Sequence, residues 1–123
     1  MLPFCLAAAF LLAGCNGPGG DALGAEGVTP RFASAYEQSL WAAADAEHCG
    51  EQRFGREVAR QQLRFRRLKA RATASGVAEA MQTIEAKWND LRSRMERDCP
   101  RDTVHWRDFR DALDKLEAAI SGL

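Results

Sequence analysis

Two cysteines and two histidines carry the side chains best suited to chemistry in this chain of 123 residues. Cys49 directly follows His48, and Cys99 precedes His105 by six positions. Thiolate and imidazole are ligand types that zinc prefers, and a neighbouring imidazole can also activate a thiol. Two cysteines can instead form a disulfide. The residue types therefore permit a metal site, a reactive Cys49 or a disulfide, although the spacing matches none of the common zinc motifs.

A basic segment is the second feature of interest. Residues 51–72 hold eight basic side chains against two acidic ones, a net charge of +6. Six of the arginines recur every three or four residues, which places them on one helix face. We call this set the arginine strip: Arg53, Arg56, Arg60, Arg64, Arg67 and Arg71. Guanidinium groups bind phosphate and carboxylate well, so the strip is a candidate site for an anionic partner.

The alternative interpretation of the arginine strip is a solvated face. Its charge would then be partly neutralised by acids on neighbouring helices, of which four are suitably placed: Glu85, Asp90, Asp108 and Asp111.

The chain lacks the sequence patterns of common enzymes. We find no G-x-S-x-G, H-E-x-x-H, P-loop, glycine-rich dinucleotide loop or haem-binding C-x-x-C-H motif. We therefore expect no catalytic activity and no cofactor. The 17 basic and 17 acidic residues balance, so net charge does not indicate a nucleic-acid partner either.

Helices are expected to position these residues. From residue 31 onward strong helix formers dominate and no segment alternates with a period of two, so we predict an all-α domain over residues 31–123. The predicted helices span about 31–48, 52–73 and 77–98, and a fourth begins near Asp102 or Thr103, either of which is a good N-cap. A left-handed Gly50, the Ser75-Gly76 turn and Pro100 separate them.

Each predicted helix has one apolar face. The faces consist of Phe32, Tyr36, Leu40 and Ala43; of Phe54, Val58, Phe65, Leu68 and Ala72, interrupted by Gln61; of Val77, Met81, Ile84, Trp88, Leu91 and Met95; and of Trp106, Phe109, Leu113, Leu116 and Ile120. Four such segments with short connections predict a small up-down-up-down four-helix bundle, with a three-helix bundle as the alternative.

The first 15 residues have the pattern of an export signal. Residues 2–14 are apolar but too short to span a bilayer, for which a helix needs about 20 residues, and they fit a secretory signal. They lead into Leu12-Ala13-Gly14-Cys15, which resembles the lipobox of bacterial lipoproteins. The resemblance implies a signal peptide at 1–14, cleavage before Cys15, and a diacylglycerol on its thiol. Further acylation, by palmitate for example, would make the membrane anchor firm, because one chain alone binds only marginally.

The residues after the lipobox indicate where and how the domain is held. In the lipoprotein family an Asp after the cysteine tends to retain the protein at the inner membrane, so Asn16 at this position favours the outer membrane. Residues 15–30 are rich in Gly and Pro and predict a flexible linker. Fully stretched, it would reach roughly 50 Å.

The bundle topology predicts a disulfide between Cys49 and Cys99. The first and third helices of an up-down-up-down bundle finish at the same end, and each cysteine terminates one of them. An exported location permits the bond, and closing a loop of about 50 residues contributes roughly 4 kcal/mol in the chain-entropy treatment. We prefer this disulfide to a metal site built from His48, Cys49, Cys99 and His105, and to a reactive Cys49.

These features predict an envelope lipoprotein that carries a helical binding or structural module. Its partner would be an envelope protein or an anionic envelope component, with the arginine strip as the candidate surface and without nucleic acid. The first alternative is an inhibitor or adaptor of a periplasmic enzyme, which would dock through the loops around Cys49 and Cys99. The second is a small metal-binding or thiol-based protein.

Overall fold

The computed structural model describes residues 29–50, 52–96, 98–99 and 104–123, and this part of the chain contains four α-helices and no strand. The helices are α2 (Pro30–Cys49), α3 (Gly55–Ala74), α4 (Ala78–Ser93) and α5 (His105–Ser121), and a short 3₁₀ turn, η3 (Gln52–Phe54), precedes α3. The all-α, four-helix prediction is confirmed and the three-helix alternative is wrong. The predicted signal peptide, Cys15 and the linker as far as residue 28 lie outside the described residues.

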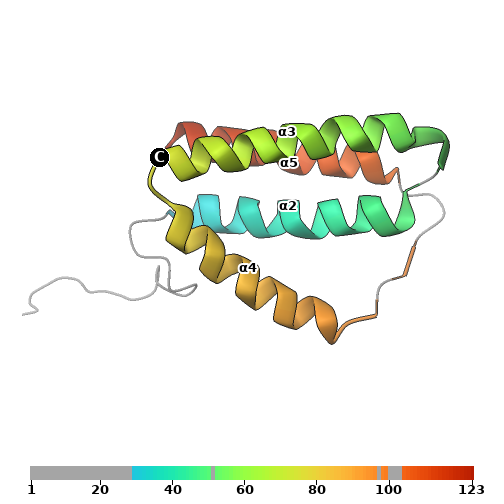
Figure 1. Ribbon diagram of the computed structural model, residues 1–123, viewed down its shortest axis with the longest axis horizontal. Coiled ribbons are helices and arrows are strands. Elements are labelled where there is room, and N and C mark those ends of the chain that lie inside the picture. Colours follow the sequence, from blue (N-terminus) through green and yellow to red (C-terminus); the bar gives the residue numbers. More distant parts are fainter. Residues whose placement is uncertain (1–28, 51, 97, 100–103) are drawn as a thin grey trace, which may run out of the picture.

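The helices alternate in direction. In Figure 1, α2 and α4 run one way while α3 and α5 run back, as the up-down-up-down prediction requires. The most extensive packing joins α2 with α5, α3 with α5, and α2 with α4. The consecutive helices α2 and α3 touch little, whereas α5 packs against both of them. Helix α5 therefore joins α3 to α2, and α2 in turn joins α4 to the bundle.

The core follows most of the predicted apolar faces. Its largest fully buried side chains come from α2, α4 and α5: Tyr36, Phe32, Phe109, Ile84, Leu113 and Leu116. Aromatic rings link the helices, because Tyr36 packs on Phe65 with centroids 6.1 Å apart, and Phe65 packs on Phe109 at 5.9 Å. Trp88 and Trp106 are only partly buried at the edge of this core. No helix in the described part of the chain is long and apolar enough to cross a membrane.

The start of α2 corrects the predicted linker boundary. Thr29 is the N-cap, and its Oγ1 accepts a hydrogen bond of 3.1 Å from the backbone N–H of Phe32. Pro30 lies in the first turn, where a missing N–H has no consequence. The prediction that the linker extends through Pro30 is therefore wrong, because the Thr29-Pro30 pair starts the helix.

Two predicted glycine breaks differ in their geometry. Gly76 has φ of 91°, the left-handed conformation that glycine adopts without strain, so the predicted turn is confirmed. Gly50 is extended, with φ −65° and ψ 138°, so its predicted left-handed conformation is wrong. Glycine is still required there because a Cβ would lie 2.2 Å from the carbonyl oxygen of Ala46.

Helix α4 is shorter than its apolar pattern predicts. It ends at Ser93, so the prediction that it continues to residue 98 and stops at Pro100 is wrong. Leu91 and Met95, predicted to be core, are 44% and 48% exposed. Figure 1 shows the reason, since α4 diverges from the other helices towards its C-terminal end. Without a neighbouring helix to bury them, the last apolar residues do not sustain another turn.

Helix α5 begins later than predicted. Its N-cap is Val104, which makes no side-chain capping hydrogen bond, so a start at 102 or 103 is wrong. The proposed caps Asp102 and Thr103 lie outside the described residues. His105 opens the helix and is buried.

Candidate functional site

The disulfide is the first predicted feature that the structure brings together. Cys49 is the last residue of α2, and it is bonded to Cys99, with Cα atoms 5.4 Å apart. Cys99 follows α4 by six positions, so the bond ties the diverging end of α4 back to the bundle. The predicted pairing is therefore confirmed. We call this end of the bundle the disulfide end.

The four residues of the alternative metal site are only partly assembled. The ligand atoms of His48, Cys49 and Cys99 lie within 4.8 Å of one another, but His105 does not belong to this group. A disulfide sulfur is not a thiolate, and the thiolate is both the metal ligand and the nucleophile. The oxidised protein thus presents His48 beside a disulfide, and the four-ligand alternative to the disulfide is not assembled.

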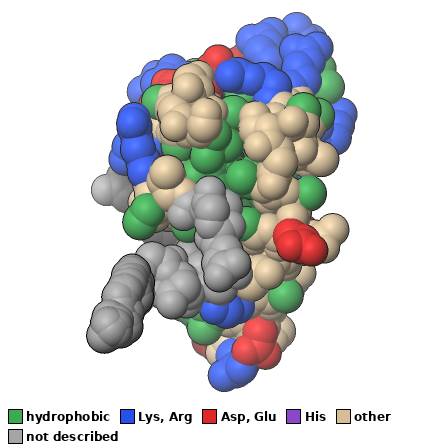
Figure 2. All heavy atoms as spheres, turned by 90° about the vertical axis from the view of Figure 1, so that its left-hand side faces the viewer, with side chains coloured by type: hydrophobic (Ala, Val, Ile, Leu, Met, Phe, Trp, Pro, Cys, Tyr) green, Lys and Arg blue, Asp and Glu red, His purple; other side chains and the backbone are tan. Residues whose placement is uncertain are grey.

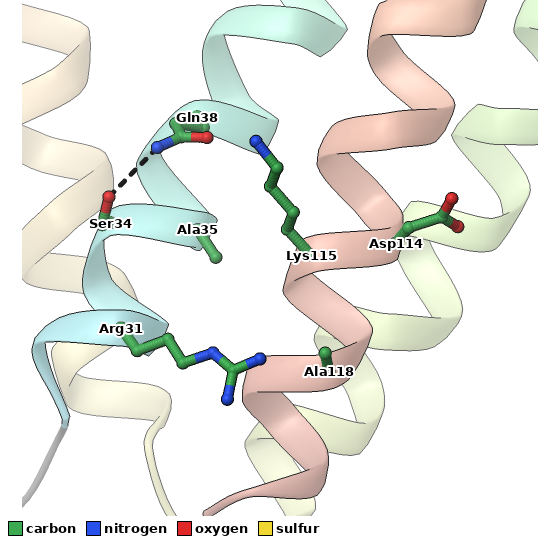
Figure 3. A pocket seen from close by; sticks show the side chains of 7 residues that line it. All are labelled: Arg31, Ser34, Ala35, Gln38, Asp114, Lys115 and Ala118. Carbon is green, nitrogen blue, oxygen red and sulfur yellow. Dashed lines mark hydrogen bonds between the residues drawn. The ribbon is translucent and has the colours of Figure 1, made fainter.

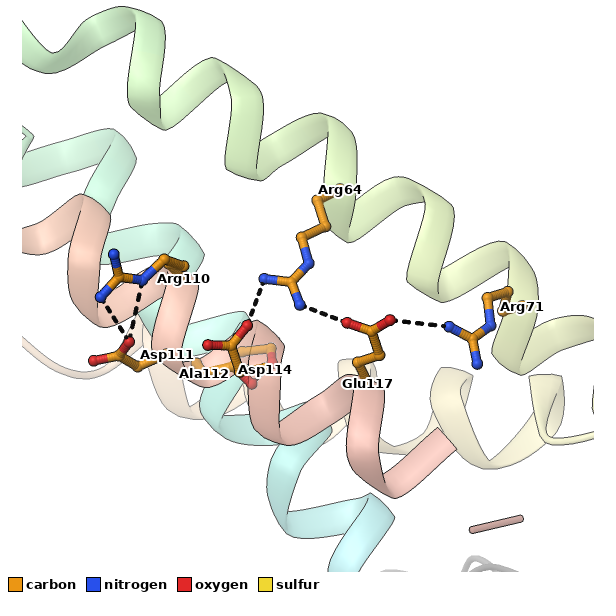
Figure 4. A network of polar contacts seen from close by, with 8 residues as sticks. Arg64, Arg71, Arg110, Asp111, Ala112, Asp114 and Glu117 are labelled. Carbon is orange, nitrogen blue, oxygen red and sulfur yellow. Dashed lines mark hydrogen bonds and ion pairs between the residues drawn. The ribbon is translucent and has the colours of Figure 1, made fainter. Parts of the chain in front are cut away.

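The inner edge of the arginine strip is held by ion pairs to α5. The guanidinium of Arg64 lies 2.8 Å from Asp114 and 2.6 Å from Glu117. Glu117 also forms an ion pair with Arg71 at 3.5 Å, so one carboxylate joins two turns of α3 to α5 (Figure 4). Desolvation by partial burial lowers the pKa of Arg64, but the hydrogen bonds and the charges of Glu117 and Asp114 together raise it more, and the net shift is upward. Arg64 therefore acts as a charged clamp between α3 and α5.

The outer edge of the strip faces solvent. Arg56 and Arg67 are exposed and make no ion pair within the described part of the chain. Among the described residues, Arg60 pairs only with Glu57 of its own helix, at 3.1 Å. The exposed Leu63 lies between them in sequence. Figure 2 looks at the end where α3 and α5 finish and shows Lys and Arg side chains gathered on the α3 and α5 side. The arginine strip thus has two edges. Its inner edge, Arg64 and Arg71, holds α3 to α5, and its outer edge, Arg56, Arg60 and Arg67, faces solvent.

The acids that neutralise the strip are not the predicted ones. Glu85 accepts a hydrogen bond from Tyr36, Asp90 pairs with Arg94, and Asp111 pairs with Arg110. Asp108 makes no ion pair among the described residues. Asp114 and Glu117 take this role because the packing of α3 on α5 places them opposite Arg64. Tertiary contacts between α3 and α5 therefore decide which acids lie opposite the arginine strip.

A buried hydroxyl contact is a feature that the apolar pattern does not reveal. Tyr36 of α2 is fully buried and donates a hydrogen bond to Glu85 of α4. Burial is the main cause that raises the pKa of the Tyr36 phenol, followed by the hydrogen bond and the charge of Glu85. The one signal in the sequence for such a contact is Tyr36 itself, because a buried tyrosine hydroxyl usually requires a hydrogen-bond partner.

This contact predicts how stability changes at alkaline pH. The raised pKa means that the folded chain keeps the Tyr36 proton when the unfolded chain loses it, above about pH 10. The stabilisation is complete below that pH and declines as pH rises, by about 1.4 kcal/mol per pH unit. Urea titrations at several alkaline pH values should show this slope, and Tyr36→Phe should remove it. Tyr36 is the only tyrosine, so tyrosinate absorbance appearing near pH 10 in the folded protein would contradict the prediction.

Two hollows lie beside α2. The first, at the disulfide end, measures about 310 Å³ between α2 and α4, and its lining comprises Trp41, Ala44, Asp45, His48, Arg92 and Met95. Trp41 contributes an apolar surface to it and packs edge-to-face on Trp88, with centroids 5.8 Å apart. It opens where α4 diverges. The second hollow is a groove of about 400 Å³ between α2 and α5. The spacing of apolar residues in the sequence predicts neither hollow.

Comparison with known proteins identifies no relative. No protein-family model matches the chain, and no curated protein or solved structure is significantly similar to it.

Proposed function

We propose that this chain is a lipid-anchored binding module of the bacterial envelope, and that the outer edge of the arginine strip binds an anionic envelope component. The observation that carries the proposal is the exposure of Arg56 and Arg67, which have no ion-pair partner among the described residues. The inner edge of the strip is already used within the fold by Arg64 and Arg71. The proposal involves no catalytic step.

The anchor half of the proposal is supported by sequence. The lipobox-like Leu12-Ala13-Gly14-Cys15 provides the acylation site. Helix α2 begins at Pro30 with its cap at Thr29, which leaves residues 16–28 as the tether. Thirteen residues span about 45 Å at full extension. The domain can therefore rotate until α3 faces the lipid surface.

The binding half is supported by charge and geometry. Arg56 and Arg67 are eleven residues apart on α3, which is about 16 Å along a helix. An arginine close to an anionic surface contributes about 1 kcal/mol, and the attraction decays within a Debye length of about 8 Å at physiological salt. The exposed Leu63 between them adds an apolar contact. Binding should therefore be moderate and sensitive to salt.

Vesicle binding tests the strip in a chain whose lipidation is prevented by Cys15→Ser. We expect binding to phosphatidylglycerol vesicles and not to phosphatidylcholine vesicles. Arg56→Gln with Arg67→Gln should weaken it about thirtyfold, because two contributions of about 1 kcal/mol are removed. The matched control is Arg94→Gln with Arg107→Gln, which removes the same charge from the C-cap of α4 and from α5 and should leave binding unchanged.

Two results would overturn the proposal. Equal weakening by both variant pairs would mean that only net charge matters and that the strip is not a site. For the anchor, the intact mass of the unsubstituted protein purified from native membranes should show an acylated Cys15. An unmodified thiol at Cys15 would contradict the anchor.

A further inference from the structure

We propose that the groove between α2 and α5 binds the free carboxylate end of a short peptide with small side chains. The groove measures about 400 Å³, within the range of small-ligand sites. It lies between α2 and α5, whereas the outer edge of the arginine strip lies on the exposed side of α3. The inference is therefore independent of the proposed function.

Small residues create the groove. Ser39 of α2 is fully buried, and its hydroxyl donates to the carbonyl oxygens of Ala35, at 2.9 Å, and of Ala112 on α5, at 3.4 Å. Such short side chains let the two helices approach closely. On the outer side of this contact, Ala35 and Ala118 line the groove. Methyl-sized groups are therefore the apolar parts of a ligand that this lining accommodates.

Two cations enter the groove from opposite sides. Figure 3 shows Arg31 of α2 and Lys115 of α5 in the space between the helices, while Asp114 points away. Asp114 is paired with Arg64, so it does not neutralise the groove. Arg31 and Lys115 form no ion pair with any residue that the structure describes. The two cations lie towards opposite ends of the groove and favour an anionic ligand, and the Arg31 guanidinium at one end suits a carboxylate.

Neutral polar groups suit the peptide part of the ligand. The Gln38 side-chain NH₂ donates to the Ser34 Oγ at 3.1 Å. This contact orients the amide and leaves the Gln38 carbonyl oxygen as an acceptor and the Ser34 hydroxyl as a donor. A peptide offers the complementary N–H and C=O. The lining thus combines a carboxylate-binding end, peptide-binding groups and an alanine floor.

An NMR titration of the mature chain carrying Cys15→Ser tests the inference, with N-acetyl-alanyl-alanine as the probe. We expect saturable shifts of the amides of Ser34, Ala35 and Ala118. The C-terminal amide of the same peptide should bind at least tenfold more weakly. Arg31→Gln and Lys115→Gln should each weaken binding up to about fivefold, as expected for exposed ion pairs. Arg94→Gln is the matched control and should have no effect.

Three outcomes would overturn the inference: shifts that map outside the groove, equal binding of the amidated peptide, or saturation by inorganic phosphate without competition from the peptide. The variant Arg56→Gln with Arg67→Gln should retain peptide binding. A failure of the groove is therefore distinguishable from a failure of the arginine strip.

Discussion

Replacing Cys49 and Cys99 together with alanine should lower the free energy of unfolding by about 4 kcal/mol. The disulfide closes a loop across a sequence separation of 50 residues, and the loss of that constraint gives the unfolded chain the corresponding conformational entropy. A bundle of this size buries a modest fraction of its surface, so the loss is a large share of its total stability. Urea denaturation of the Cys15→Ser chain and of the Cys49→Ala, Cys99→Ala variant measures the difference.

Reduction provides the control for the disulfide prediction. A dithiol reductant should shift the urea midpoint of the Cys15→Ser chain almost to that of the double alanine variant, and should leave the variant itself unchanged. The structure also indicates where reduction acts first, because Cys99 restrains the segment after α4, in which Met95 is exposed. A difference below about 1 kcal/mol would show that the bond contributes little beyond the packing.

The second large effect is expected at Leu113, and it comes with a matched comparison in the same chain. Leu113 of α5 is fully buried, whereas Leu91 of α4 is 44% exposed. Leu113→Ala should lower the free energy of unfolding by about 2–5 kcal/mol through lost transfer energy and a cavity. Leu91→Ala removes the same atoms from a surface position and should change it by less than about 0.5 kcal/mol.

Thermal or urea unfolding of the two leucine variants shows whether the apolar sequence pattern or the tertiary packing decides the loss of stability. The two residues have equivalent places in their apolar patterns, so local periodicity alone predicts equal effects. Similar losses for both variants would mean that the end of α4 packs against the bundle in solution, contrary to its divergence in Figure 1.

Local sequence patterns predicted the helical class and much of the core. The spacing of three and four residues that includes Phe109, Leu113 and Leu116 identified the buried face of α5, because a helix repeats its faces at that interval. The pairing of Cys49 with Cys99 was also predictable, since alternating helix directions place the ends of the first and third helices together. These features depend only on residue type, spacing and chain direction.

The remaining features depend on how the helices lie against one another. Nothing in the pattern of α4 distinguishes Ile84, which is buried, from Leu91, which is exposed, because the difference is the distance to α2. The arginine strip is uniform as a sequence, but the packing of α3 on α5 sets Arg64 opposite Asp114 and leaves Arg67 in solvent. Side-chain burial and charge pairing arise from contacts between distant segments, so tertiary structure alone decided which cations hold the fold and which are free to bind.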